Sequence, residues 1–574
     1  MRKLFLAIVC LMLAAVASAQ ELKPLKIKSA STSSQNSTNE GAAKAIDGNY
    51  STFWHSVWSG GGTSFPVTFT ITMAEEQMVD VVRYVPRQDQ PNGNWGKVEV
   101  SYRNTETGNK YVSLGTFDLG QSSSAYEFEI GQVCKYVRFS IKDGYGGWAT
   151  ASEIEAFSID YAKRDAFKPY FQDELFTELK PEVTSSEGIE DPDLKALVDN
   201  LLNTEDYDKF RIAEYEPYRP VGSLQNELKT SAPYNQWENP TGVYVKNGEK
   251  LIVAVNAPEG ERLGIKVRNW VDSEAGSTYS LRSGLNVITA STEGNVFLDY
   301  YTDNYKTAPN VKVHFINATV RGYWDQQTMT NADFKKMLGK LKSDNSIFIV
   351  RSEHAQLAYP VSAWKQYCPE NVDSLMTLYQ QVQWAERDIM GLNKYGRQTK
   401  NRQLYFASTY GFMAATGVGA YCNVNSLQAL MTPDSKKFDF WGVGHEWGHN
   451  NQISPGFHWS GCGETTNNIY ASWAQIHFTG TPSNLRLEDE WSGIDEYSNM
   501  RGGRMQTYFE EALRKGVQWQ LQDGPDYHGA TPNTITVMGY DYNGNSTGMV
   551  TTTSRNYDHF VKLVPFWQLN LWGT

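Results

Sequence analysis

The stretch from Phe440 to Trp473, FWGVGHEWGHNNQISPGFHWSGCGETTNNIYASW, decides how the C-terminal part of this chain is interpreted. His445 and His449 are four residues apart, so on a helix they lie on one face, one turn apart, where both can bind one metal ion. Glu446 follows the first histidine, so its carboxylate lies beside a water molecule at that metal. It can act there as a general base while the metal lowers the pKa of the water. The run HEWGH therefore predicts a zinc-dependent hydrolytic site.

A zinc ion in such a site takes a third protein ligand and keeps a fourth position for water. A histidine six residues after His449 is excluded, because position 455 is proline. His458 and Glu464 remain as candidates. Glu464 opens a predicted second helix, ETTNNIYASW, in which Asn468 shares its face and can accept a hydrogen bond from the free ring N–H of a ligand histidine. Glu464 with this support is the favoured third ligand, and His458 is the alternative.

Chance is a poor explanation of the pattern. Only 9 of the 574 residues are His, so H-E-x-x-H arises by chance about once in a hundred such chains. The simpler alternative is an ordinary helix with two hydrogen-bonded histidines. Gly442, Gly444 and Gly448 argue against it, because each costs up to ~1 kcal/mol in a helix relative to Ala. A helix tolerates that cost where its backbone passes close to a neighbour or ligand. Ser454-Pro455-Gly456 is predicted to end this helix.

The N-terminus reads as an export signal. An apolar run follows Arg2 and Lys3, and Ala17-Ser18-Ala19 offers a cleavage site before Gln20. Residues 1–19 are therefore expected to be a cleavable signal peptide of a periplasmic, cell-surface or extracellular protein without a lipid anchor. No later segment has about 18 uninterrupted apolar residues, so no membrane span is expected. Without the signal peptide, the chain has 50 basic and 64 acidic residues. This excess of acidic residues argues against nucleic acid and anionic membranes as partners.

Length and patterning divide the chain, because 574 residues exceed a single compact core. Residues 27–160 contain short β-rich runs such as PVTFTITM, KVEVSYR and KYVRFSIK between Gly, Asn and Asp clusters, which predicts an antiparallel sandwich. Residues 161–229 are expected to be a linker with short helices. Residues 230–320 return to strands, and GVYV, Asn247-Gly248 and LIVAV together signal a hairpin. Residues 321–574 are predicted to form a mostly α-helical catalytic domain.

Two helices of this last part can be placed in detail. Phe334, Met337, Leu338 and Leu341 follow helical spacing after the capping pattern Thr330-x-x-Asp333. A longer helix is predicted from about Ser374 to Met390, with Gly391 as its stop. Its apolar stripe consists of Leu375, Leu378, Val382 and Ile389.

The cysteines do not suggest a metal site. None of the four outside the signal peptide forms a C-x-x-C pair, so a cysteine-based zinc site is not expected. One disulfide at most is expected, among the last three, and ordinary buried thiols are the simpler interpretation. The four are Cys134, Cys368, Cys422 and Cys462.

The decisive segment resembles the enhancin-like, mucin-targeting zinc peptidases of peptidase family M-sixty. Their pattern is HExxH and then, after a variable gap, a Glu ligand on a second helix. Here 14 residues separate His449 from Glu464, and HEWGHNNQ, ETTNN and an upstream NPTGVYV also look like that family. The resemblance covers residues 230–574 and implies a second β-sandwich at residues 230–320, followed by a zincin-like domain. It also implies cleavage of O-glycosylated proteins such as mucins beside a glycosylated Ser or Thr. The family's chains usually continue past LVPFWQLNLW, so this domain is expected to be C-terminally shortened.

Residues 27–160 resemble the discoidin, or coagulation-factor-five/eight type C, fold of the family-thirty-two carbohydrate-binding modules. AIDGNYSTFWHS (45–56), YVPRQDQPNG (84–93) and GGWATASEIEAF (146–157) carry the resemblance. It implies a structural Ca²⁺ held by oxygen donors and a galactose-type sugar site with an aromatic platform. The implied calcium residues are Asp47, Thr52 and Glu153, and the implied sugar residues are His55, Arg87, Asn92 and Trp148.

A packing role is the alternative for Trp148 and His55, and Trp54 is expected in the core.

Three functions are weighed for the chain as a whole. The favoured one is a monomeric zinc endopeptidase acting on O-glycoproteins and targeted by its sugar-binding module. A glycan-binding adhesin with an inactive peptidase-like domain is the second, and a glycoside hydrolase the third, although no pair of carboxylates stands out for it. The oxyanion-stabilising residue stays open among His477, Tyr527, His528 and His559.

Overall fold

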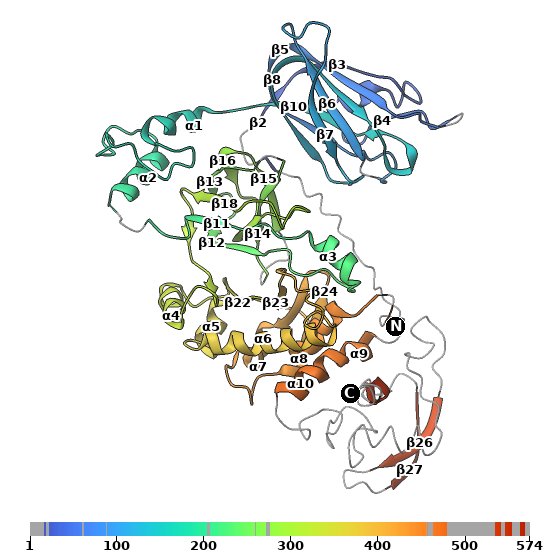
Figure 1. The fold of residues 1–574 in the computed structure, drawn as a ribbon, viewed down its shortest axis with the longest axis vertical. Coiled ribbons are helices and arrows are strands. Elements are labelled where there is room, and N and C mark those ends of the chain that lie inside the picture. The colour runs from blue at the N-terminus through green and yellow to red at the C-terminus, as the bar shows by residue number, and fades with distance from the viewer. Residues whose placement is uncertain are drawn as a thin grey trace. The chain divides into compact units, whose positions relative to one another are not determined.

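The computed structural model divides the chain into two compact units, which are described separately (Figure 1). The first comprises Met1–Leu202, Ile252–Val255 and Thr278–Thr289, and the second Asn203–Leu251, Asn256–Ser277 and Ala290–Thr574. The residues described are 17–18, 22–59, 62–87, 89–203, 207–258, 260–270, 276–454, 456, 463–478, 534–540, 546–553, 563–566 and 568. The predicted signal peptide lies almost wholly outside them, except for β1 (Ala17–Ser18).

An antiparallel β-sandwich forms the main part of the first unit, as the sequence predicted. Its longest strands, β5 and β8, alternate buried and less buried residues and pair along most of their length. Trp54 lies in the core, fully buried against Phe69. The sheet order is β2-β10-β5-β8-β6-β7, with β3 on β5 and β4 on β9. The elements are β2 (Leu22–Leu25), β3 (Ile27–Thr32), η1 (Ala42–Ala45), β4 (Trp54–His55), β5 (Val67–Val85), β6 (Lys97–Arg103), β7 (Val112–Asp118), β8 (Tyr126–Ile141), η2 (Tyr145–Gly147), β9 (Thr150–Ala151) and β10 (Glu153–Ile159).

The segment after the sandwich contains short helices, as expected for the predicted linker. Lys163 pairs with Asp191 and Asp193 at 2.7 Å each, which ties the first of these helices to the start of the second. The elements are α1 (Ala162–Phe167), η3 (Lys168–Tyr170), α2 (Pro192–Asn203), β11 (Ile212–Tyr215) and α3 (Val221–Leu228).

The predicted hairpin around Asn247-Gly248 is wrong, although Gly248 does have a positive φ of 78°. The strand before it, β12 (Asn239–Val245), pairs with β17 and β19, whereas the strand after it, β13 (Lys250–Val255), belongs to another sheet. Nearly every residue of both strands is buried, whereas a hairpin with one solvated face alternates. The turn therefore carries the chain from one sheet to another. The remaining strands here are β14 (Leu263–Arg268), β15 (Gly276–Leu281), β16 (Gly284–Thr289), β17 (Gly294–Asp299), β18 (Val311–Phe315) and β19 (Thr319–Val320).

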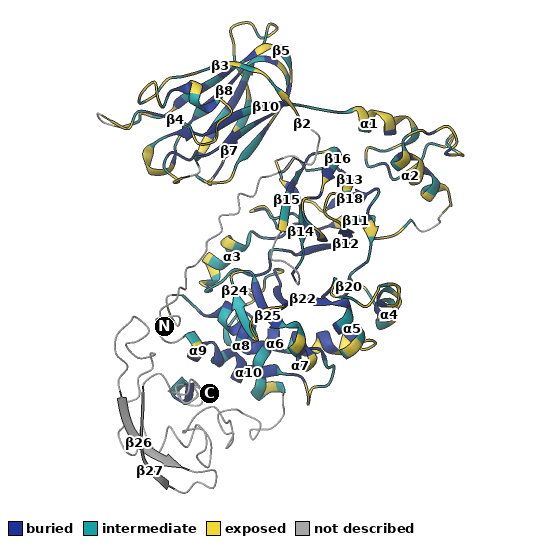
Figure 2. Ribbon diagram, turned by 180° about the vertical axis from the view of Figure 1, so that it is seen from behind, coloured by how far each residue is buried: buried dark blue, intermediate teal, exposed yellow. Residues whose placement is uncertain are grey.

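The expectation of a mostly α-helical catalytic region is also wrong, because residues from 324 onward build a six-stranded mixed sheet. Its order is β20-β21-β22-β23-β25-β24, and β24 lies at the edge, paired with β25 alone among the strands that the structure describes. Figure 2 shows β22 and β25 in the buried colour and β24 in the intermediate one. The strands are β20 (Trp324–Asp325), β21 (Ile347–Arg351), β22 (Ala355–Pro360), β23 (Gln403–Ser408), β24 (Met413–Thr416) and β25 (Gly419–Asn423), and a separate pair is β26 (Thr534–Tyr540) with β27 (Ser546–Thr553).

Both faces of this sheet are covered, and for that reason its strands lack the alternation that identifies a half-exposed strand. Leu357, Tyr359 and Tyr405 face the core made with the helices. Their neighbours along the strands pack into a second core with residues from the preceding β region. That second core contains Trp237, Trp270, Phe297, Ile347, Ile349, Ala358, Leu404, Phe406 and Tyr421.

Helices α6, α8 and α10 run side by side along one face of the sheet (Figure 1). The predicted capping box of Thr330 and Asp333 starts α4, and Gly391, with φ 76°, follows the end of α6. The helix that carries HEWGH ends at Asn451, three residues before the predicted Ser454 stop. The helices are α4 (Asn331–Lys340), α5 (Val361–Tyr367), α6 (Val372–Ile389), η4 (Val424–Ser426), α7 (Gln428–Met431), α8 (Phe440–Asn451), α9 (Gly463–Thr466) and α10 (Asn468–Phe478).

The glycines of α8 allow other chain segments to approach its backbone closely. A Cβ at Gly444 would lie 3.0 Å from the Cα of Ala471 on α10. One at Gly448 would lie 2.5 Å from the carbonyl oxygen of Asn467, between α9 and α10. The cost of glycine in this helix is therefore offset by close packing, as the sequence predicted.

Cys134, Cys368 and Cys422 are buried free thiols, and Cys462 lies outside the described residues. In the part of the chain that the structure describes, no helix is long and apolar enough to cross a membrane.

Gly448→Ala should destabilise the second unit by about 1–3 kcal/mol, because the new methyl group overlaps a backbone carbonyl that cannot turn aside. The matched control is Gly339→Ala in α4, where a Cβ meets nothing within 4 Å. That change should be neutral or stabilising by up to ~1 kcal/mol. Chemical denaturation of both variants measures the difference. Equal stabilities would show that α8 does not need glycine at this contact.

Candidate active site

Helix α8 presents two imidazole rings on one face. It starts behind Asp439, whose side chain accepts a hydrogen bond from Gly442 N at 2.8 Å. On the opposite face Trp447 is fully buried, and its indole N–H donates to the carbonyl oxygen of Leu404 on β23 at 3.1 Å. This anchoring leaves His445 and His449 half-buried with ring centroids 4.9 Å apart.

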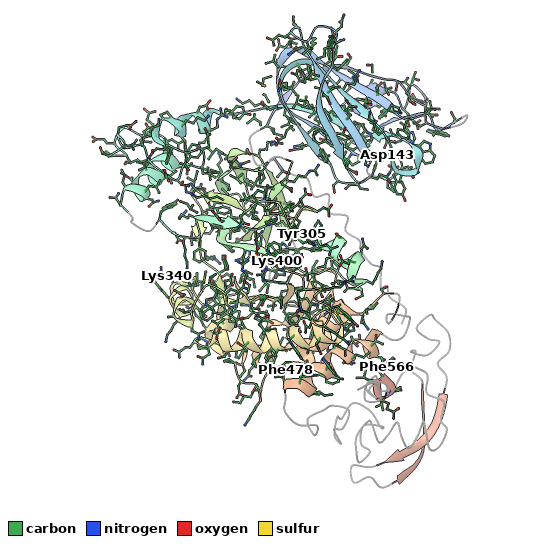
Figure 3. All side chains as sticks on the ribbon, viewed as in Figure 1. Asp143, Tyr305, Lys340, Lys400, Phe478 and Phe566 are labelled. Atoms are coloured by element: carbon green, nitrogen blue, oxygen red, sulfur yellow. The ribbon has the colours of Figure 1, made fainter. Side chains whose placement is uncertain are left out.

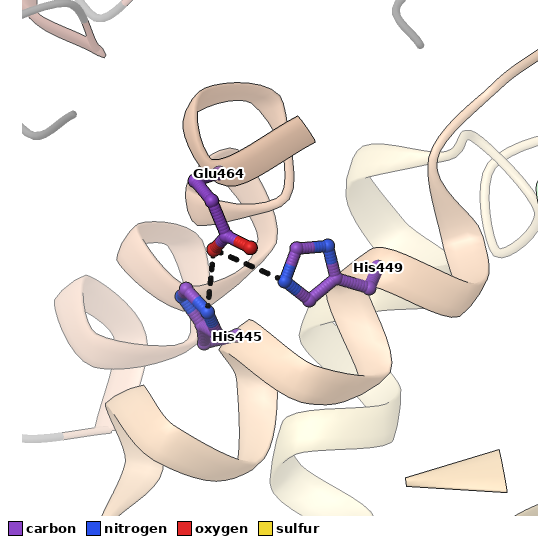
Figure 4. A group of neighbouring side chains, drawn as sticks. All are labelled: His445, His449 and Glu464. Carbon is purple, nitrogen blue, oxygen red and sulfur yellow. Dashed lines mark ion pairs between the residues drawn. The ribbon is translucent and has the colours of Figure 1, made fainter. Parts of the chain in front are cut away.

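The third side chain, Glu464, comes from α9 (Figure 4). Its Oε2 atom lies 3.2 Å from Nε2 of His445 and 3.3 Å from Nε2 of His449. The three ligand atoms lie within 4.8 Å of one another, and no other set of three or more His, Cys, Asp or Glu converges this way among the described residues. Two imidazole nitrogens and a carboxylate oxygen are a donor set that suits zinc. These three residues could therefore hold a zinc ion.

The charges of the cluster reinforce one another. Burial favours the neutral form of Glu464, yet hydrogen bonds from His445 and His449 outweigh it and hold the pKa of the carboxyl well below its usual range. Burial likewise opposes charge on His445, but the Glu464 hydrogen bond and the nearby Glu446 raise its net pKa. A positive charge between these groups is therefore stabilised, whether a proton or a metal ion supplies it.

Asn468 accepts a hydrogen bond from the ring N–H of His445, one of the predicted ligand histidines. Its Oδ1 lies 2.7 Å from Nδ1 of His445, and its Nδ2 donates to the carbonyl oxygen of Glu464 at 2.7 Å. The helix breaks between the two residues, since α9 ends at Thr466 and α10 begins at Asn468. The side-chain contact forms despite the break.

Glu446 lies next to the cluster in a different environment. Its carboxylate is buried, with Oε1 3.9 Å from Nε2 of His445. Burial raises the pKa of Glu446, while the two histidines and a hydrogen bond with the backbone of Ala415 partly oppose the rise. A carboxylate with a raised pKa beside a candidate metal position is suited to accept and release a proton.

An open pocket of about 480 Å³ joins the cluster to the edge strand. Asn450 connects α8 to this strand, since its Nδ2 donates to the carbonyl oxygen of Thr416 on β24 at 3.0 Å. The sequence predicted no role for this strand, because MAAT carries no charged or catalytic side chain. The lining residues are Ser231, Ala232, Met413, Ala414, Ala415, Thr416, Gly417, His445, Glu446, His449, Asn450, Gln452 and Glu464.

Several other candidates lie elsewhere. His477 is exposed near the end of α10, whose last residue Phe478 is labelled in Figure 3, and its Nδ1 bonds the carbonyl oxygen of Trp473 at 2.9 Å. It is not among the residues that line the pocket. The alternative third ligand His458 and the remaining oxyanion candidates lie outside the described residues, namely Tyr527, His528 and His559.

The four predicted sugar residues of the sandwich lie in neighbouring segments, with His55 at the end of β4 and the other three on loops. The rings of His55 and Trp148 meet edge-on at 6.2 Å. A Cβ on Gly146, which has a positive φ of 68°, would contact both the Trp148 ring at 2.7 Å and Oδ1 of Asn92 at 3.5 Å. The Arg87 guanidinium stacks on Phe53 at 4.0 Å, and Phe53 neighbours His55 at 6.4 Å. The four side chains thus form one continuous patch.

Individual environments within this patch differ. His55 is buried, and its Nδ1 donates to the carbonyl oxygen of Ser56 at 2.7 Å, which leaves Nε2 as an acceptor. Burial lowers the pKa of His55, so the neutral ring is favoured. Arg87 forms a bidentate pair with Asp89 at 2.6 and 2.8 Å. Phe53 and Asp89 therefore join this patch, although the sequence analysis did not assign them.

The candidate calcium residues also converge. The Thr52 hydroxyl donates to Asp47 Oδ1 at 2.9 Å, and Gly48 N donates to Glu153 Oε1 at 3.3 Å. Burial and the nearby Asp47 raise the pKa of Glu153 to about 7. Its Oε2 atom is buried and has no hydrogen-bond partner in the structure. An orphaned buried carboxylate oxygen beside a second carboxylate fits a hard cation.

An HExxH helix with a carboxylate from the next helix defines the class of zinc metallopeptidases. Residues 323–573 match the family described as Peptidase M60, enhancin and enhancin-like. Residues 29–154 match the F5/8 type C domain. The chain therefore contains a metallopeptidase domain of the M60 type, preceded by an F5/8 type C domain.

Individual relatives cover limited parts of the chain. A galactose oxidase of Gibberella zeae is 35% identical over 120 residues, which are 20% of this chain and 17% of that protein. Antigenic protein P1 of Entamoeba histolytica is 34% identical over 125 residues, 22% of this chain and 11% of that protein. The chain thus spans less than a fifth of the length of these curated relatives.

A solved metallopeptidase from Bacteroides thetaiotaomicron has a similar fold. It is 19% identical, with a TM-score of 0.50 over 72% of this chain and 80% of that chain. The solved CBM32-1, CBM32-2 and M60 catalytic domains of Clostridium perfringens ZmpB are 18% identical, with a TM-score of 0.44 over 84% and 56% of the two chains.

Replacing Glu464 tests the third ligand. Glu464→Ala should reduce zinc affinity by more than the roughly 10- to 100-fold that the loss of an outer partner costs. Glu370→Ala is the control, because the Glu370 carboxylate is exposed and pairs with Lys335. Neither residue belongs to the candidate metal cluster. Zinc affinity is measured by competition with a chromophoric chelator. Unchanged zinc binding in Glu464→Ala would move the third ligand to His458.

Proposed function

We propose that this protein is an exported, zinc-dependent endopeptidase that hydrolyses O-glycosylated proteins such as mucins. The observation that carries the proposal is the convergence of His445, His449 and Glu464 within 4.8 Å beside the buried Glu446. Membership of the M60 family supports the reaction class. The F5/8 type C domain supports a glycan-bearing substrate, because such a module would keep a glycosylated protein attached to the enzyme.

His445, His449 and Glu464 would hold the zinc ion through two Nε2 atoms and one carboxylate oxygen. A zinc ion bound there would lower the pKa of a water molecule and polarise the scissile carbonyl group. Glu446 takes the proton of the attacking water on its carboxylate and delivers it to the leaving amine as the peptide bond breaks. Burial, which raises the pKa of this carboxyl, helps it to retain the proton between the two steps.

The edge strand β24 is suited to hold the peptide. Among the described strands it pairs with β25 alone, so its other edge could offer backbone N–H and C=O groups to an extended chain. Residues Met413 to Thr416 line the same pocket as Glu446, and Ala415 bonds Glu446 through its backbone. A peptide that adds to β24 would therefore pass the general base with its backbone aligned.

The N-terminal module would bind a galactose-type glycan through His55, Arg87, Asn92 and Trp148. Trp148 is partly exposed and would stack on the apolar face of the sugar, while Arg87 and Asn92 donate to hydroxyl groups. A calcium ion held by Asp47, Thr52 and Glu153 would stabilise the loop that contains Asp47 and Thr52. Attachment through this second site raises the local substrate concentration without changing the chemical step.

Replacement of the general base separates catalysis from metal binding. Glu446→Ala should lower kcat/KM on a mucin-type glycopeptide by about 10²- to 10⁴-fold, because it removes proton transfer. Zinc content should stay unchanged, and Glu446→Gln should behave alike at nearly constant volume. Cleavage is followed by mass spectrometry, with a chelator-treated sample as the reference for metal dependence. Retained activity would rule out Glu446 as the base, and an inactive but zinc-loaded parent protein would favour a glycan-binding adhesin.

The sugar-binding module can be tested independently of the peptidase. Arg87→Ala should weaken glycan affinity about tenfold or more, since it removes charge-assisted hydrogen bonds, and should leave turnover of a short soluble glycopeptide unchanged. Arg103→Ala is the matched control, because Arg103 stacks on Tyr136 at 4.0 Å as Arg87 stacks on Phe53. Glycan binding is measured by calorimetry. An equal fall in glycopeptide turnover would contradict the division of labour between the two domains.

A further inference from the structure

Gln452 occupies the position that follows α8, three residues after the ligand His449. It is 1% exposed. Its amide nitrogen Nε2 donates to the carbonyl oxygen of Gly463 and to the hydroxyl of Thr466, both at 2.7 Å. Its amide oxygen Oε1 lies 3.3 Å from Nδ1 of His449. One side chain thus contacts both the ligand-bearing helix α8 and the start of α9.

These contacts define the protonation pattern of His449. A carbonyl oxygen can only accept, so Gly463 fixes the amide with Nε2 toward α9 and Oε1 toward the histidine. Oε1 in turn can only accept, so the ring proton is on Nδ1. Asn467 is compatible with this tautomer, because its amide nitrogen Nδ2 lies 2.9 Å from Nε2 of His449. Nε2 of His449, which lies 3.3 Å from Oε2 of Glu464, is therefore the ring nitrogen left to bind a metal ion.

The same arrangement is found at the other histidine. Asn468 accepts from Nδ1 of His445 at 2.7 Å and donates to the carbonyl oxygen of Glu464 at 2.7 Å. Like Gln452, it is 1% exposed. Each ligand histidine is thus tied by one buried amide to the backbone of α9, at Gly463 in one case and at Glu464 in the other.

We propose that Gln452 is a positioning residue of the metal centre, and that Gln452 and Asn468 together act as two amide clamps. The clamps hold both imidazoles in the Nδ1–H tautomer and set their distance from Glu464 before the metal binds. The inference rests on the proposed zinc-binding function and extends it, because it explains how ligands from two helices are aligned. An outer hydrogen-bond partner of this type orients the ligand ring and raises its basicity.

The backbone around Gln452 is itself held in place. Ser231 N donates to the carbonyl oxygen of Gln452 at 2.8 Å, and Ser454 N donates to that of Lys229 at 2.7 Å. The Ser231 hydroxyl also donates to the carbonyl oxygen of His449. The segment before β12 therefore fixes the end of α8, so that the Gln452 amide has little freedom to leave its partners.

Zinc affinity, measured by competition with a chromophoric chelator, tests the clamp without reference to activity. Gln452→Met keeps the volume and removes all three side-chain hydrogen bonds, and it should weaken zinc binding about 10- to 100-fold. Gln452→Glu restores the acceptor for His449 and should recover most of the affinity. Gln356→Met is the matched control, because Gln356 is fully buried and its amide donates to Trp237 at 2.8 Å, remote from the ligands. It should leave zinc affinity unchanged.

Two results would overturn the clamp. One is parent-like zinc affinity in Gln452→Met. The other is an equal loss in Gln452→Met and Gln452→Glu, since the loss would then come from packing rather than from the histidine hydrogen bond. Thermal unfolding of the metal-free variants verifies that each is folded. A parent protein that binds no zinc would instead refute the proposed function, and the clamp with it.

Discussion

The close approach of α8 to the chain at Asn467 is the constraint on which the site depends. Gly448 allows it, because a Cβ there would lie 2.5 Å from the Asn467 carbonyl oxygen. Glu464 precedes this contact by three residues, and Asn468 follows it by one. A larger side chain at position 448 would force this part of the chain to shift, and it lies next to the residues that meet the imidazoles at 3.2 and 3.3 Å. Backbone packing between helices thus sets the geometry of the candidate metal centre.

The sheet provides the rigid support for that contact. Trp447 binds the carbonyl oxygen of Leu404 on β23, and Asn450 binds that of Thr416 on the edge strand β24. The helix is therefore fixed to the sheet at two points, one in the core and one beside the pocket. Because this helix carries His445, Glu446 and His449, one element positions the proposed general base and two of the three proposed metal ligands beside β24. Precision of this kind is what a preorganised active site requires.

The incorrect predictions both concern strands whose burial or pairing local sequence periodicity does not reveal. Strands β21, β22, β23 and β25 are buried on both faces, so they show no alternation and were included in a mostly helical region. The strands around Asn247-Gly248 resemble a hairpin locally but belong to different sheets. The sandwich was predicted correctly, because its strands alternate and local periodicity reports that pattern directly. The capping box of α4 is equally local, and it too was predicted.

The sequence by itself determined the features that depend on short spacings: two histidines on one helical face, a glutamate beside them, and an amide four residues after Glu464. Only the tertiary structure decided that Glu464 meets the histidines, that Gln452 bonds His449 and the start of α9, and that β24 borders the pocket. These contacts join segments whose separation along the chain carries no periodic signal. Packing around Gly448 and Trp447 brings them together, and packing is a property of the whole fold rather than of any window of sequence.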